Sequence, residues 1–114
     1  MGESEKTVGL SVAYITCPRL AMAQVLGRQL VQERLAACVN IIGPISSIYK
    51  DTALVEKQEY VLLAKTRSDR IESLTQRVSQ LHEYETPAIL AWNVGGNERF
   101  LDWVTHSLST KQIT

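Results

Sequence analysis

The chain begins, after a polar start, with an alternating pattern that predicts a β-strand over residues 8–15. One face of the predicted strand carries Val8, Leu10, Val12 and Tyr14, and the other face carries Gly9, Ser11, Ala13 and Ile15. A period of two over eight residues is typical of an extended strand. Thr16-Cys17-Pro18 ends this pattern, and apolar residues then recur at helical spacing to about Leu35. We therefore expect a first helix that begins near the proline.

The middle of the chain predicts a hairpin of two strands. Residues 37–42 form a short apolar run that ends at Gly43-Pro44, and residues 45–50 resume an extended pattern. Together they indicate one long, bent strand. Residues 51–57 are polar and predict a turn, which leaves residues 58–66 as the second strand of the hairpin.

Two further helices are expected around a fourth strand. Ser68 or Asp69 can cap the first of them, as in a capping box. Its apolar stripe consists of Ile71, Leu74, Val78 and Leu81. Residues 82–87 interrupt this period, residues 88–94 predict the strand, and a glycine pair ends it. A short closing helix has apolar residues at Phe100, Leu101, Trp103, Val104 and Leu108.

This order of elements predicts an α+β, ferredoxin-like β-α-β-β-α-β sandwich with a short C-terminal helix. We expect one domain over residues 8–108, with a flexible tail over 1–7 and another over 109–114. Right-handed crossovers place both main helices on the same face of the sheet, so the other face is bare. The last two strands are nevertheless apolar on both sides, which predicts self-association through the sheet. Periodicity alone leaves the number of subunits open.

Composition and charge exclude several classes of function. The chain has 12 Lys and Arg residues and 12 Asp and Glu residues, mixed in sign along its 114 residues. There is no basic stripe for nucleic acid, and no apolar stretch of the roughly 18 residues that a membrane span needs. We expect a cytoplasmic protein with two reduced cysteines. The chain has no Gly-rich phosphate loop, nucleophile elbow or paired acid motif, so we do not expect an enzyme.

Three residues are candidates for metal binding. Cys17 stands where a strand ends and a helix begins, where the helix dipole favours a thiolate; it is equally well explained as a small buried residue. Cys38 lies in an apolar run, where the structural explanation is the stronger. His82 follows a helix at the mouth of a loop, where it can ligate copper or zinc or interact as a cation with the helix dipole. No sequence spacing links the three, so a metal site must be built by the fold.

Polar residues at strand ends and in loops form a second candidate set, for a ligand cleft between subunits. The same residues are also explained as solvated strand ends. They include Tyr49, Lys50, Lys65, Arg67, Tyr84 and Glu85.

Several of these segments resemble the CutA family of divalent-cation tolerance proteins. The resemblance begins at Thr16-Cys17-Pro18, Glu33 to Asn40, Ser47-Ile48-Tyr49 and Lys65-Thr66. It continues through Leu81-His82, Tyr84 to Pro87 and Leu101-Asp102-Trp103, and so covers residues 8–108. The octapeptide at 33–40 is the most specific of these segments.

The resemblance implies a ferredoxin-like subunit in a tight cytoplasmic homotrimer that binds copper or another divalent cation and takes part in the response to metal ions. It implies no organic cofactor, no nucleic acid and no membrane. Matching positions give Cys17, Cys38 and His82 as metal candidates. They give Tyr49, Lys65, Tyr84 and Glu85 as cleft candidates. The trimer is also similar to that of the PII signalling proteins, which implies an alternative role as a sensor or adaptor for a small effector or a partner protein.

Three departures from the family pattern stand out. Asp51, Ala53 and Leu54 occupy the positions of a usual Trp and a Gly-Lys turn, which puts the hairpin tip in question. Glu83 stands where His is usually followed by Pro. Ile15 replaces a cysteine that some members carry, so a copper site that requires this thiol cannot form.

Overall fold

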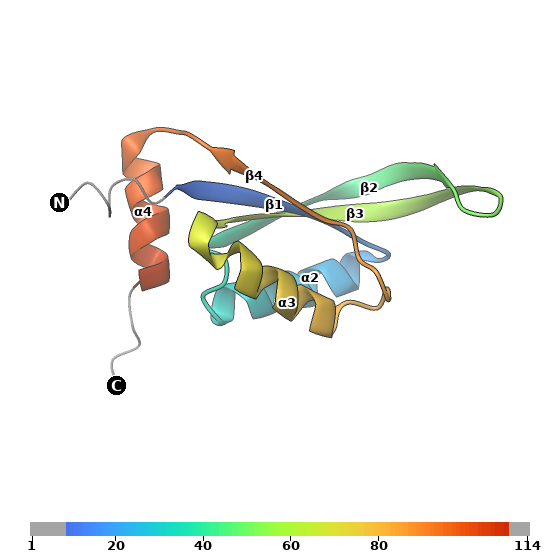
Figure 1. Cartoon of the computed structure of the whole chain (residues 1–114), viewed down its shortest axis with the longest axis horizontal. Helices are drawn as coiled ribbons and strands as arrows, with labels where there is room; N and C mark the ends of the chain where they lie inside the picture. The colour runs from blue at the N-terminus through green and yellow to red at the C-terminus, as the bar shows by residue number, and fades with distance from the viewer. Residues whose placement is uncertain (1–8, 110–114) are drawn as a thin grey trace.

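The computed structural model describes residues 9–109, which form an antiparallel sheet with two long helices on one of its faces (Figure 1). The strands are β1 (Leu10–Cys17), β2 (Cys38–Lys50), β3 (Leu54–Arg67) and β4 (Ile89–Val94). The helices are α2 (Leu20–Gln32), α3 (Ile71–Leu81) and α4 (Glu98–Ser109), and the 3-10 turn η1 (Ser68–Arg70) precedes α3. The predicted α+β, ferredoxin-like class is confirmed.

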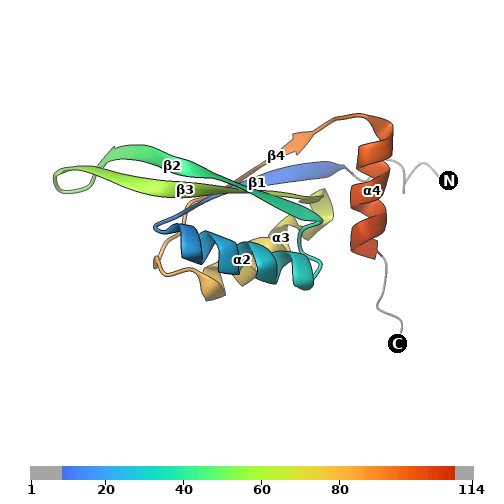
Figure 2. The same ribbon diagram turned by 180° about the vertical axis from the view of Figure 1, so that it is seen from behind.

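The strand order in the sheet is β2-β3-β1-β4, with every neighbouring pair antiparallel. α2 and α3 lie side by side under the sheet in both views, and α4 stands at one end of it (Figures 1 and 2). The predicted tail over 1–7 lies outside the described residues. So does the predicted tail over 109–114 apart from its first residue, Ser109, which is the last residue of α4.

The face of the sheet that carries α2 and α3 holds the main core. Alternate residues of β1 and β3 point toward the helices, because side chains alternate along a strand. The fully buried residues here are Ala13, Ile15, Cys17, Leu62 and Ala64 from the strands and Leu30, Leu74 and Val78 from the helices. A smaller cluster around Leu10, Val104 and Leu108 attaches α4. The rest of the opposite face, which we call the open face, has no helix over it.

Helix ends differ from the predictions in two places. α2 ends at Gln32 and not at Leu35, because Arg34 adopts φ 61° and the N–H of Leu35 bonds the carbonyl of Leu30 at 2.9 Å, as in a Schellman motif. The capping box expected before α3 is absent, and that prediction is wrong. Asp69 instead forms an ion pair with Arg67.

The hairpin is longer than the alternation predicted. β3 begins at Leu54, so the turn expected over 51–57 is wrong for its second half. Residues 54–58 pair with 46–50 beyond the point where β1 stops, opposite Tyr60. We call residues 45–59 the hairpin arm; it projects from the body in Figure 1. Only residues 54–57 of the arm were missed as strand, because Glu56 and Lys57 interrupt the apolar pattern that predicted the flanking segments.

The arm departs from the body at an irregularity in β2. The pairing register shifts between Ile42 and Ile45, where a cis peptide bond joins Gly43 to Pro44. A Cβ atom on Gly43 would lie 2.5 Å from Cδ2 of Tyr60. The close approach of β2 to the Tyr60 ring therefore requires glycine at this position.

Candidate functional site

The structure places Cys17 in the core rather than at a helix terminus. Its side chain is fully buried on the helix face of β1. Burial, together with the negative charges of Glu59 and Glu83, raises the pKa of the Cys17 thiol from its ordinary value of 9.0 to about 11. The thiolate expected from the helix dipole is therefore disfavoured, because desolvation and nearby carboxylates both oppose the charged form.

His82 is buried, with 8% of its surface exposed, so the expectation of an exposed histidine is wrong. Its Nε2 lies 2.8 Å from the carbonyl oxygen of Thr16. The backbone N–H of Tyr84 donates to its Nδ1 at 3.0 Å. A carbonyl can only accept and a backbone N–H can only donate, so Nε2 donates its proton to Thr16 and Nδ1 accepts from Tyr84. Both ring nitrogens are engaged in tying the 82–84 loop to β1.

Cys38 is half-buried at the start of β2, opposite Lys65 in the pairing register and on the open face. Across residues 9–109, no three side chains of His, Cys, Asp or Glu come together in a way that could hold a metal ion. The fold therefore does not gather the three metal candidates into one centre.

None of the helices in this same region has the length and apolar character needed to cross a bilayer.

Polar groups converge instead in a cavity of about 370 Å³ where the hairpin arm leaves the body. We call it the arm-base pocket. β1, the arm and the 82–88 loop all contribute to it, on the side of the open face. Its lining residues are Thr16, Tyr49, Lys57, Glu59, Tyr84, Thr86 and Ala88.

A hydrogen-bonded relay runs through this pocket. The Lys57 ammonium donates to the Tyr84 hydroxyl at 2.9 Å, and that hydroxyl donates to Oε2 of Glu59 at 2.7 Å. The ammonium and Oε2 of Glu59 are 3.8 Å apart, and only 6% of the Glu59 side chain is exposed. The ammonium also lies 4.4 Å from the centroid of the Tyr84 ring and 5.5 Å from that of Tyr49. A buried carboxylate is thus compensated by one cation and one phenol.

The relay changes the acid-base properties of its members. The hydrogen bond with Tyr84 is the main cause that raises the pKa of Lys57, so this side chain keeps its charge. Burial is the main cause that raises the pKa of the Tyr84 phenol, so this side chain keeps its proton. The pocket therefore presents a stable ammonium and a neutral hydroxyl.

Two of the four cleft candidates meet in the arm-base pocket, namely Tyr49 and Tyr84. Lys65 lies further along β3, where its ammonium bonds the side chain of Asn40, and Glu85 is exposed and does not line the pocket. Neither Lys57 nor Glu59 was among the predicted site residues: Lys57 lay in the turn predicted over 51–57, and Glu59 lay in the strand predicted over 58–66 without being singled out. The available signal was the alternation Val55, Lys57, Glu59 against Glu56 and Gln58.

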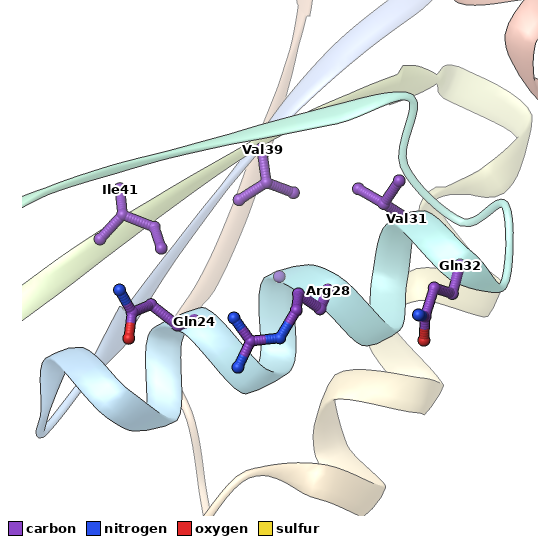
Figure 3. A pocket seen from close by; sticks show the side chains of 7 residues that line it. Gln24, Arg28, Val31, Gln32, Val39 and Ile41 are labelled. Carbon is purple, nitrogen blue, oxygen red and sulfur yellow. The ribbon is translucent and has the colours of Figure 1, made fainter.

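A second hollow, of about 360 Å³, lies between α2 and the edge strand β2 (Figure 3). Val39 and Ile41 extend from β2 toward the helix, and Gln24 and Arg28 line the helix side. A Cβ atom on Gly27 would lie 3.2 Å from Cγ1 of Val39, so this glycine lets α2 approach the strand closely. Arg28 is its only charged lining residue among those described, and no polar network comparable to the relay forms there.

Comparison with known proteins agrees with this architecture. The model of the CutA1 divalent ion tolerance protein family matches residues 11–107. "Divalent-cation tolerance protein CutA" of Thermus thermophilus is 43% identical over 95 residues, which cover 82% of this chain and 92% of that protein. "Protein CutA, chloroplastic" of Arabidopsis thaliana is 40% identical over 109 residues, which cover 94% of this chain and 60% of that protein. A crystal structure of CutA1 from Oryza sativa is 36% identical, with a TM-score of 0.86 over 89% of this chain and 94% of that one.

The chain therefore belongs to the CutA1 divalent ion tolerance protein family. It spans about three fifths of the length of some curated relatives, since the matches cover 60% of the Arabidopsis protein and 64% of a Xenopus laevis homologue.

Proposed function

We propose that this protein acts in the tolerance of divalent cations as a homotrimeric sensor that binds a small effector in the arm-base pocket. The observation that carries the proposal is the convergence of the Lys57, Tyr84 and Glu59 relay in a cavity of about 370 Å³. Clefts of this size with a few convergent polar groups are typical binding sites for small molecules. The PII-like alternative is thus better supported than a thiol-imidazole metal centre.

Direct binding of copper or another divalent cation is the second candidate. It is favoured by the name of the Thermus thermophilus relative, a divalent-cation tolerance protein. Cys38 is the most accessible of the three metal candidates, because Cys17 and His82 are buried. Copper binding should depend on pH, since thiolate and imidazole ligands must lose their protons.

Calorimetry with Cu(I) and Cu(II) on the wild type, Cys38→Ser and the Cys17→Ser, His82→Ala double variant separates the two candidates. The sensor proposal expects no stoichiometric binding that depends on these three side chains. One copper ion per chain, lost in Cys38→Ser or in the double variant while the circular dichroism spectrum of that variant stays native, would favour the metal centre and contradict the sensor proposal.

The homotrimer is supported by the apolar side chains on the open face and the arm. Leu90 and Trp92 of β4 are 61% and 47% exposed, and Leu54 on the arm is 68% exposed. Leu90 and Trp92 lie two positions apart on β4 and so share one face, and an exposed apolar patch of this kind is uncommon on a monomer. β2 and β4 are also the two edge strands of the sheet, with one backbone edge each open to pairing among the described residues.

Size-exclusion chromatography with light scattering tests the assembly. We expect about three times the chain mass of 12.7 kDa at micromolar concentration. Leu90→Asp should dissociate the assembly, whereas Gln80→Glu on the exposed surface of α3 should leave it intact. A monodisperse monomer of the wild type would overturn the proposal. A cytoplasmic location is part of it too, and fractionation of cells that produce the full-length protein tests this part.

A further inference from the structure

We infer that the effector of the arm-base pocket is a small organic monocarboxylate, with Lys57 as the cation that anchors it. The inference rests on the proposed function, because it names the chemical class of the sensed effector. Three features carry it: which charge of the relay a ligand can reach, how many negative charges the pocket tolerates, and what surrounds the charge.

The reachable charge is positive. Glu59 has only 6% of its side chain exposed, and its Oε2 already accepts the hydroxyl proton of Tyr84. Lys57 has 34% of its side chain exposed, and its ammonium has three N–H groups, of which one bonds the Tyr84 hydroxyl and a second interacts with the Tyr49 hydroxyl. A ligand that enters the pocket therefore meets an ammonium with donor capacity to spare, and an anionic ligand is recognised.

The pocket favours a single negative charge over two. The ammonium is 3.8 Å from Oε2 of Glu59, so its positive charge is partly balanced before a ligand arrives. A monoanion restores a favourable pairing with the outer side of the ammonium. A dianion such as the HPO4²⁻ form of inorganic phosphate places a second charge close to the buried carboxylate, where like charges repel strongly. A divalent or organic cation is excluded by the ammonium itself.

The surroundings of Lys57 suit a short organic body. The rings of Tyr49 and Tyr84 flank the ammonium, and the methyl group of Ala88 lies on the same lining. These groups provide apolar contact area for a planar or short aliphatic fragment. Thr16 and Thr86 add hydroxyls that can donate to a carboxylate. A volume of about 370 Å³ holds a metabolite-sized ligand but no macromolecule.

Sodium benzoate is the probe for the test, with the full-length assembled protein and amide NMR or calorimetry as the readout. We expect saturable binding of benzoate and none of inorganic phosphate or benzylammonium at equal ionic strength. Lys57→Gln should weaken benzoate binding at least tenfold, and Lys57→Arg should retain most of it. Lys65→Gln is the matched control: this lysine is on the same strand and face, bonds Asn40, and does not line the pocket.

Four results would overturn the inference. These are no saturable benzoate binding by the wild type, an equal loss in Lys57→Gln and Lys65→Gln, equally tight binding of phosphate, or binding of benzylammonium to the same amides. If Lys57→Gln does not fold, the inference is tested by two other measurements: benzoate binding to Lys57→Arg, and binding of benzylammonium to the wild type. The proposed function fails by other results, namely a monomeric mass or a Cys- and His-dependent copper site, so the two failures can be told apart.

Discussion

Replacing Tyr84 by Phe should destabilise the protein more than removing the hydroxyl group of a solvent-exposed tyrosine would. The change removes only the oxygen that accepts from Lys57 at 2.9 Å and donates to Glu59 at 2.7 Å. Glu59 is a buried carboxylate, and hydrogen bonds to charged groups contribute about 1.5–3 kcal/mol. Lys57 can move closer than its present 3.8 Å and offset part of this loss. We therefore expect the free energy of unfolding to fall by about 1–2.5 kcal/mol.

Urea unfolding followed by circular dichroism measures this change, at one protein concentration because the stability of an oligomer depends on it. Tyr60→Phe is the matched control, since Tyr60 packs on the core and its hydroxyl has no hydrogen bond within residues 9–109. It should change the free energy by less than about 0.5 kcal/mol. A double-mutant cycle with Glu59→Gln isolates the coupling between the two side chains, which we expect to exceed about 0.5 kcal/mol.

A fall for Tyr84→Phe no larger than that for Tyr60→Phe would refute the reasoning. So would a coupling energy near zero with Glu59→Gln. Either result would mean that the buried carboxylate is compensated without the phenol, and the relay would then have no energetic role.

Three further predictions follow from the core and the buried histidine. Because the pKa of Cys17 is raised from 9.0 to about 11, the folded state holds this proton more tightly than the unfolded state; this contribution to stability is complete below pH 9 and is lost as pH rises through about 11. Urea midpoints should therefore decline over this range less steeply in Cys17→Ala, and equal slopes would contradict the assignment. Nitrogen NMR of His82 should show the proton on Nε2 at neutral pH, and the other tautomer would argue against the hydrogen bonds that join the 82–84 loop to β1. His82→Ala should lower the free energy of unfolding by about 1–3 kcal/mol because both hydrogen bonds are lost, and an unchanged melting temperature would argue against them too. Leu62→Ala, at a fully buried site, should lower the free energy of unfolding by about 2–5 kcal/mol. The same change at the exposed Leu54 should lower the free energy of unfolding of the isolated subunit by less than about 0.5 kcal/mol. Similar losses at both positions would place the core elsewhere.

Local patterns were sufficient where one face of an element is buried. The stripe of Ile71, Leu74 and Val78 predicted α3 because a helix half-covered by a sheet must be apolar every three to four residues. The alternation from Leu10 predicted β1 for the same reason with a period of two. The octapeptide at 33–40 gave the family, which the match over 11–107 confirms.

Local patterns failed where burial comes from elsewhere in the chain. His82 follows a helix and reads as a surface residue, yet its ring donates a hydrogen bond to the carbonyl of Thr16, which is distant in sequence. Cys17 precedes a helix, yet its side chain points into the core and its pKa rises. The environment of a titratable group is set by what packs against it, and such contacts are long-range.

Periodicity and short specific segments were enough to predict the class of fold, the order of its elements and the family, because these features depend on local patterns. The place where the polar chemistry gathers depends on long-range packing. The arm-base pocket joins β1, the hairpin arm and the 82–88 loop, and of its charged pair Lys57 lies in the predicted turn and Glu59 in the predicted strand. Pairing with β2 places both side chains on one face of β3, and no local pattern indicates that this face meets Tyr84.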